Sequence, residues 1–149
     1  MTQVIYSMQF TGQIVPDEGA NNQRNVKAVA RSSRIESLAG PGGIHGSVQP
    51  VEGEDSTMES VVILTGNGRF QEHGSIAFGD SGNTLRFTTI GEGHISSSPE
   101  PSVNHGSVIW RVEGGEGQFE GAAGLITSNF TISTTGDVTD HQFGVIYTG

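Results

Sequence analysis

Glycine restricts the fold of this chain more than any other feature, because it makes up 23 of the 149 residues. The glycines are scattered among Val, Ile, Thr and Phe without the three-residue period of collagen. Hydrophobic residues make up 33% of the chain, which is too many for a disordered linker. Glycine at this density suits short strands joined by tight turns, and strands that bend sharply around a narrow barrel. The composition therefore predicts an all-β fold.

Alternation of apolar and polar side chains locates the strands. In residues 3–15, one parity carries Val4, Tyr6, Met8, Phe10 and Ile14. A period of two is the pattern of a half-buried strand. Similar patterns predict further strands at residues 26–31, 44–51, 58–64, 69–78, 84–96, 103–112, 121–133 and 141–147. Residues 38–43, which are rich in glycine and contain a proline, are expected to form a loop.

The connections between these strands are short, and no segment has an apolar stripe of helical period. Short links join antiparallel neighbours, because a parallel crossover needs about a dozen residues. A meander of about eight or nine strands closes most naturally into a barrel, which leaves no exposed edge. We therefore expect residues 1–149 to form a single closed antiparallel barrel domain of about eight strands, with a two-sheet β-sandwich as the alternative.

Composition also excludes several kinds of function. The chain has no cysteine, which rules out disulfides, iron–sulfur clusters, thiolate zinc sites and a cysteine nucleophile, and which fits a reducing cytoplasm. Its net charge of −9 repels phosphate backbones, so nucleic acid is not an expected partner. There is no apolar run of about 18 residues and no signal-peptide pattern at the start, so neither membrane insertion nor secretion is expected.

A short repeat occurs twice in the chain. Residues 66–70 and 115–119 both read Gly-x-Gly-x-Phe, and each follows an apolar strand. The glycines allow the positive φ angles of a tight hairpin turn, and the phenylalanine can point back into the barrel wall. Both repeats are therefore predicted to be hairpin tips rather than phosphate-binding loops, which would need a helix after them.

The second repeat belongs to a longer motif. Residues 114–124 read GGEGQFEGAAG, and residues 143–147 read FGVIY. This motif resembles the hairpin of the allene oxide cyclase-like and dirigent-like barrels, strongly over residues 108–149 and only in architecture before them. The resemblance implies an eight-stranded barrel, often a homo-oligomer, whose lumen holds a hydrophobic small molecule. It also implies cofactor-free direction of a cyclisation or coupling, but the motif describes a turn and assigns no catalytic residue.

The candidate site consists of side chains that carry a polar end group and lie on the strand faces expected to point into the barrel. Tyr6, His141 and Tyr147 can each present one donor or acceptor to a ligand, and Glu59 alternates with apolar neighbours. Burial would raise the pKa of this glutamate and suit it to general acid–base catalysis. These four residues are predicted to be catalytic. The side chains predicted to contact the substrate are Met8, Phe10, Phe87, Trp110, Phe130 and Phe143.

Other interpretations of these residues remain open. Tyr6, Trp110 and Tyr147 are equally explained as ordinary core aromatics, and Glu59 as a solvent-facing side chain. The five histidines lack the spacing of known zinc motifs, although strand pairing could bring His94 and His105 together, so no metal site and no cofactor are expected.

The leading functional hypothesis is a barrel that binds a small hydrophobic molecule and acts as a cyclase or isomerase by holding a reactive conformer. A non-catalytic carrier with the same barrel is one alternative, and a structural or assembly protein with a filled barrel is another. A titratable group in the lumen would favour the enzyme over the carrier.

Overall fold

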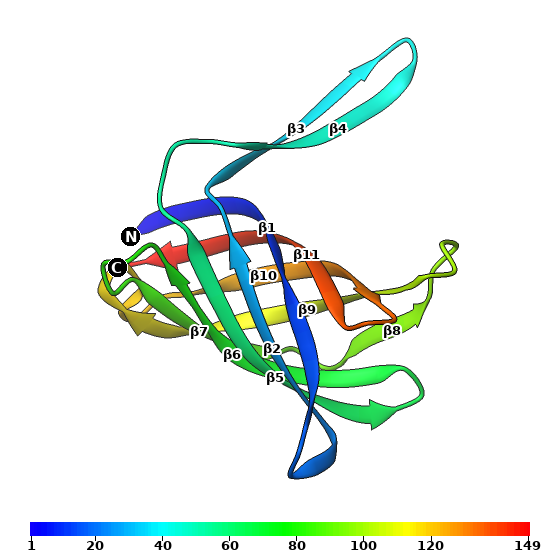
Figure 1. Ribbon diagram of the computed structural model, residues 1–149. Helices are drawn as coiled ribbons and strands as arrows, with labels where there is room; N and C mark the ends of the chain where they lie inside the picture. Colours follow the sequence, from blue (N-terminus) through cyan, green and yellow to red (C-terminus); the bar gives the residue numbers. More distant parts are fainter.

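The computed structural model describes all residues from Met1 to Gly149 and consists of a closed eight-stranded antiparallel barrel and a projecting hairpin (Figure 1). The strands are β1 (Thr2–Asp17), β2 (Ala20–Ala30), β3 (Ser33–Gly40), β4 (Gly43–Pro50), β5 (Ser56–Gly66), β6 (Arg69–Phe78), β7 (Thr84–Thr89), β8 (Gly93–Ser97), β9 (Val103–Glu116), β10 (Ala123–Ser133) and β11 (Asp137–Thr148). One 3-10 turn, η1 (Gly117–Phe119), joins β9 to β10. The predicted all-β barrel is confirmed. None of its helical segments is long and apolar enough to traverse a lipid bilayer.

The barrel closes because β9 pairs with β10 on one side and with β7 and β8 on the other. Strands β7 and β8 occupy one position in the wall, since both pair with β6 and with β9. The sequence predicted one long strand over residues 84–96, and this was wrong. The chain leaves the ladder between Thr89 and Gly93, where Gly91 has a φ of 67° that a regular strand does not adopt.

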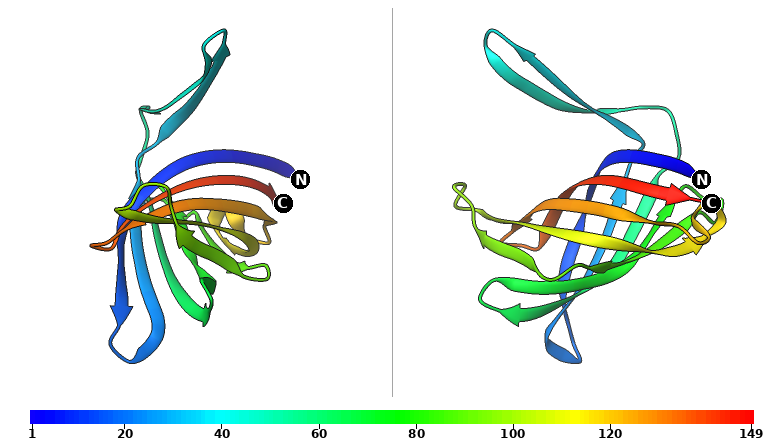
Figure 2. Two further views of the ribbon diagram at one scale, coloured as in Figure 1. Left: turned by 90° about the vertical axis from the view of Figure 1, so that its right-hand side faces the viewer. Right: turned by 180° about the vertical axis from the view of Figure 1, so that it is seen from behind.

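The hairpin formed by β3 and β4 lies outside the barrel sheet (Figures 1 and 2). The predicted strand at residues 44–51 is present as β4, but it pairs only with β3. The loop predicted at residues 38–43 was wrong, because β3 continues to Gly40 and leaves only Pro41 and Gly42 in the turn. Strands β2 and β5 therefore pair directly in the barrel wall, and the hairpin is an insertion between them.

Large apolar side chains fill most of the barrel, and both chain termini lie at one of its ends (Figure 2). At that end the ring of Phe78 contacts Tyr6 and Phe119, with ring centroids 5.2 and 5.4 Å away. Both repeat phenylalanines, Phe70 and Phe119, are buried, as their hairpin motifs predict. They lie toward opposite ends, since Phe70 follows the β5–β6 turn and Phe119 lies within the β9–β10 connection, at the end of η1.

Glycine makes the narrow barrel possible where strands bend and backbones come close. Gly12 on β1 pairs with Val138 of β11 and with Ala28 of β2, so β1 bridges its two neighbours there. A Cβ at Gly12 would lie 1.9 Å from the backbone oxygen of Lys27, far inside contact distance. Any larger residue at this position would push β1 and β2 apart.

Replacing Gly12 by alanine is expected to destabilise the barrel by about 1–3 kcal/mol or more, as overpacking against a fixed backbone does. Gly40 gives a matched control, because a Cβ there meets nothing within 4 Å. Urea unfolding of G12A and G40A measures both effects. Equal stability of the two variants would contradict the close approach of β1 and β2.

Candidate functional site

Two buried carboxyl groups lie inside the lumen and line the same pocket. Glu72 on β6 and Asp140 on β11 are 7% and 3% exposed, and both line one pocket of about 30 Å³. Half-buried apolar side chains line the side of this pocket at the barrel end away from the termini, where it is partly open to solvent: Ile14, Ile95, Phe130 and Ile132. The pocket has room for a water molecule or two, and any larger guest must displace these side chains.

Asp140 is held as an acceptor by a hydrogen-bond chain across β10, β11 and β1. Ser128 donates to its Oδ1 at 2.6 Å, and the Gln142 amide donates to its Oδ2 at 2.9 Å. The Tyr6 hydroxyl in turn donates to Oε1 of Gln142 at 2.9 Å. Because both oxygens of Asp140 accept a hydrogen bond, the arrangement favours its ionised form.

Gly144 makes room for this chain. It lies opposite Tyr6 in the β1–β11 ladder, and a Cβ there would lie 2.2 Å from the tyrosine ring. The ring therefore lies across the glycine, which brings its hydroxyl to Gln142.

Glu72 has a different environment. Ser60 on β5 donates to its Oε2 at 2.5 Å, and no hydrogen bond is made by its Oε1. The free oxygen can carry a proton. Glu72 therefore has the geometry of a protonated acid, whereas Asp140 has that of a carboxylate.

Glu72 lies beside the interruption between β7 and β8. Its backbone N–H donates to the Thr89 hydroxyl at 2.6 Å, and that hydroxyl donates to the Glu72 carbonyl at 2.7 Å. A threonine side chain thus replaces the backbone partner that the broken strand does not supply. Such irregularities in a ladder are common next to functional sites.

Trp110 supplies a donor that has no acceptor. Its indole stacks on Phe87 with ring centroids 4.0 Å apart, and it lines the same pocket. The indole N–H is buried without a hydrogen-bond partner. It lies near enough to Glu72 to lower that carboxyl's pKa, but the contact falls short of hydrogen-bond geometry. A buried free donor of this kind is costly, so it is a natural point for a ligand oxygen to bind.

Burial sets the charge state of the pocket. It raises the pKa of Glu72 to about 7, and the nearby Asp140 charge adds to the rise, while the Ser60 and Trp110 donors oppose it. Burial also raises the pKa of Asp140, against hydrogen bonds from Ser128 and Gln142 and the influence of His141. Burial and the Asp140 charge raise the pKa of Tyr6, which stays a neutral donor. The two carboxyl groups therefore differ in their partners: Asp140 accepts hydrogen bonds on both oxygens, whereas Glu72 titrates near neutral pH.

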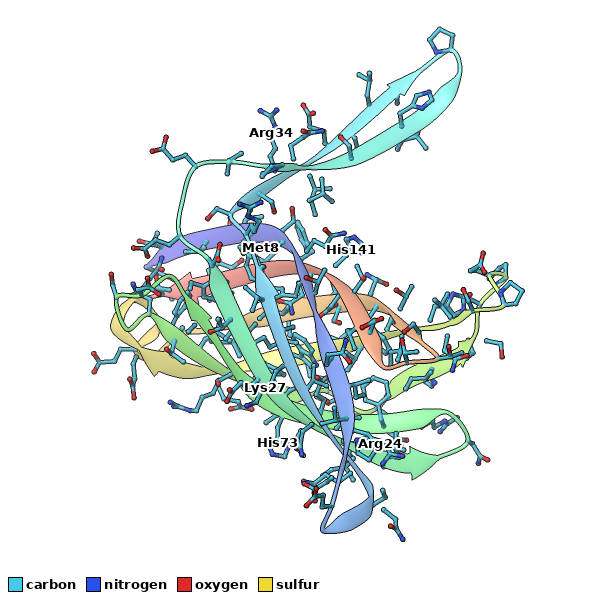
Figure 3. The ribbon with its side chains drawn as sticks, viewed as in Figure 1. Met8, Arg24, Lys27, Arg34, His73 and His141 are labelled. Carbon is cyan, nitrogen blue, oxygen red and sulfur yellow. The ribbon has the colours of Figure 1, made fainter.

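Four predicted site residues face outward, so the prediction that they point into the lumen was wrong. Glu59 lies on the outer wall with its side chain 70% exposed, 3.9 Å from the Lys27 amine (Lys27 is labelled in Figure 3). On β11, His141 accepts a hydrogen bond from Gln9 on the outer face (Figure 3), and Tyr147 accepts one from Gln3. Phe143, predicted to contact substrate, is 50% exposed.

The error on β11 has one physical cause. The sequence shows Phe143, Val145 and Tyr147 on one parity, and an apolar parity is usually the buried one. In the barrel the other parity faces inward, because it carries Asp140 and Gln142, which bond to each other and to β1 and β10. A one-residue change of parity exchanges the two faces of a strand.

The other predicted residues face the interior. Tyr6 belongs to the hydrogen-bond chain, and Trp110 and Phe130 line the pocket. Met8, Phe10 and Phe87 are buried in the core but do not line the pocket. Their roles in substrate binding stay predictions.

Three histidines lie along a groove on the outer wall. Strand pairing brings His94 and His105 to one face of β8 and β9, and the groove also contains His141, with a volume of about 430 Å³. No group of three or more His, Cys, Asp or Glu side chains is arranged to hold a metal ion.

No family model, curated protein or solved structure matches this chain. The resemblance of residues 108–149 to allene oxide cyclase-like barrels therefore stays a prediction, and the function must be argued from the lumen itself.

Glu72→Gln is expected to flatten the pH dependence of stability. A glutamate in the unfolded chain ionises near pH 4.5, whereas Glu72 in the folded protein stays protonated until about pH 7. Between these values the unfolded state binds fewer protons, so the free energy of unfolding falls as pH rises, by roughly 3 kcal/mol. Urea unfolding from pH 4.5 to 8 measures this fall in the unchanged protein and in E72Q. The exposed Glu59→Gln variant is the control, and a fall of the same size in E72Q would contradict the assignment.

Proposed function

We propose that the barrel binds a slender, largely apolar molecule with an oxygen at one end, and catalyses its cofactor-free isomerisation or cyclisation by proton transfer. The observation that carries this proposal is the protonatable Glu72 in an apolar pocket, next to the free Trp110 donor. A carboxyl whose pKa lies near the working pH is suited to act as both acid and base.

In the proposed reaction, the carboxylate form of Glu72 removes a proton from a carbon next to the substrate oxygen, and the carboxylic acid so formed returns the proton to another carbon. The proton removed is balanced by the proton returned, so neither a metal nor a redox cofactor is needed. The Trp110 N–H donates a hydrogen bond to the substrate oxygen and stabilises the negative charge that develops there while Glu72 holds the proton. Burial holds the pKa of Glu72 near neutral pH and the Asp140 charge adds to this effect, so Asp140 is a positioning residue.

Passive carriage of an apolar ligand explains the lumen less well. A carrier needs only an apolar wall, and burying two carboxyl groups costs free energy that a carrier does not require. The small volume of the pocket favours a second candidate, a structural protein with a filled barrel, because ligand sites commonly measure about 300 Å³ or more.

Trp110 gives a direct assay for occupancy of the lumen, because it is the only tryptophan in the chain. We expect its fluorescence to change saturably with members of a set of medium-chain ketones, enones and epoxides. Incorporation of deuterium from heavy water into the bound probe, measured by mass spectrometry, reports proton transfer. Glu72→Gln should slow this exchange by about 100-fold or more with binding retained.

Two further variants separate the outcomes. Asp140→Asn should move the midpoint of the pH–rate profile to lower pH, because the charge that raises the pKa of Glu72 is removed. The exposed His141→Ala should leave binding and exchange unchanged. Binding without exchange would support a carrier, exchange that survives E72Q would overturn the role of Glu72, and no response to any probe would favour the filled barrel.

A further inference from the structure

The β3–β4 hairpin, here called the arm (residues 33–50), has one apolar face. Strand pairing places Ile35 opposite Val48 and Ala39 opposite Ile44 on this face. The opposite face is mostly polar. It carries one large apolar side chain, Leu38, and also Arg34, whose guanidinium lies 3.4 Å from Glu36 (Arg34 is labelled in Figure 3). The apolar face is uncovered toward the tip, where Ile44 is 74% exposed.

The arm lacks support from its own barrel. It touches the barrel only near its base, where Ser33, Val48 and Pro50 lie beside β1. An isolated two-stranded hairpin is marginal in water and needs another surface to pack on. In every view the arm projects away from the barrel (Figures 1 and 2), so its apolar face is presented to a neighbouring molecule.

The barrel carries a second uncovered apolar surface, here called the outer patch, on β1, β11 and β10. Ile5, Val145 and Leu125 lie side by side in a row across these strands. Phe143 and Tyr147 flank Val145 on the same face of β11. Ile5, Leu125 and Phe143 are 60%, 51% and 50% exposed. The outer patch contains the side chains whose apolar pattern on β11 suggested burial.

Both surfaces are free of net charge in a chain of charge −9. Residues 2–13 of β1 and all of β10 contain no charged residue. On β11, Asp140 is buried and the exposed Asp137 is the first residue of the strand, six residues before Phe143. The arm contains one acid, Glu36, and one base, Arg34, besides a single histidine. The acidic charge therefore lies elsewhere, and two copies can bring these surfaces together without like-charge repulsion.

We propose that two copies of this chain form a twofold dimer in which the apolar face of each arm covers the outer patch of the other copy. An apolar patch of roughly 300–600 Å² marks an interaction site but is small for a stable complex. A stable interface buries about 800 Å² on each partner. When each copy contributes both an arm and an outer patch, the dimer contains two such contacts instead of one, and symmetry closes the assembly at two copies.

Light scattering coupled to size-exclusion chromatography tests the proposal. The unchanged protein at micromolar concentration should have the mass of a dimer. Ile44→Asp on the arm and Leu125→Asp on the outer patch should each give a monomer, because each buries a charge in the contact. Both positions are exposed in the single chain, so far-UV circular dichroism should show an unchanged fold. Ile90→Asp, at an exposed isoleucine outside both surfaces, is the matched control and should stay dimeric.

Mixing the two monomeric variants tests whether the arm meets the outer patch. A mixed dimer keeps one intact contact, between the arm of L125D and the outer patch of I44D. The mixture should therefore form dimers at concentrations where each variant alone is monomeric. The proposal is overturned if the unchanged protein is monomeric, if I44D stays dimeric, or if the mixture shows no association.

Discussion

The narrowness of an eight-stranded barrel is the constraint on which this structure depends. A barrel of that size has an interior just wide enough for side chains, so each inward residue must fit against those across the lumen. Aromatic rings fill the end near the termini, where Gly144 leaves room for the Tyr6 ring, and Gly12 lets β1 and β2 approach closely farther along the wall. The remaining space holds two carboxyl groups. In apolar surroundings a carboxyl group is stable only if hydrogen bonds stabilise its charge or a proton neutralises it.

The same constraint links the fold to its chemistry. Asp140 uses both oxygens as acceptors, so the unsatisfied oxygen of Glu72 is where a proton is held. The broken strand beside Glu72, bridged by Thr89, is an irregularity that closure of the wall alone does not need. A site with one acid, one fixed charge and one free indole donor is better suited to moving a proton than to storing a ligand.

Much of the fold could be predicted from the sequence, because a period of two and frequent turn residues specify antiparallel strands. The site could be predicted only in part. Tyr6 and Trp110 share a parity with apolar neighbours, which gives their direction correctly. Glu72 also shares a parity with Phe70 and Ile76, and this signal could have identified it. On β11 the apolar pattern predicts the wrong face, because the outer face of this strand is also apolar. In the proposed dimer, the arm of the second copy covers that face. The sequence pattern predicted one strand of the arm, β4, but not β3, where the glycines and the proline of residues 38–43 suggested a loop.

Carbon-13 NMR of the side-chain carboxyl groups shows directly whether Glu72 is a protonated acid inside the lumen. We expect one glutamate carboxyl that titrates near pH 7, is absent in Glu72→Gln, and moves to lower pH in Asp140→Asn. A spectrum in which every glutamate titrates below about pH 5, as unperturbed side chains do, would contradict a protonated acid in the lumen and with it the proposed chemistry.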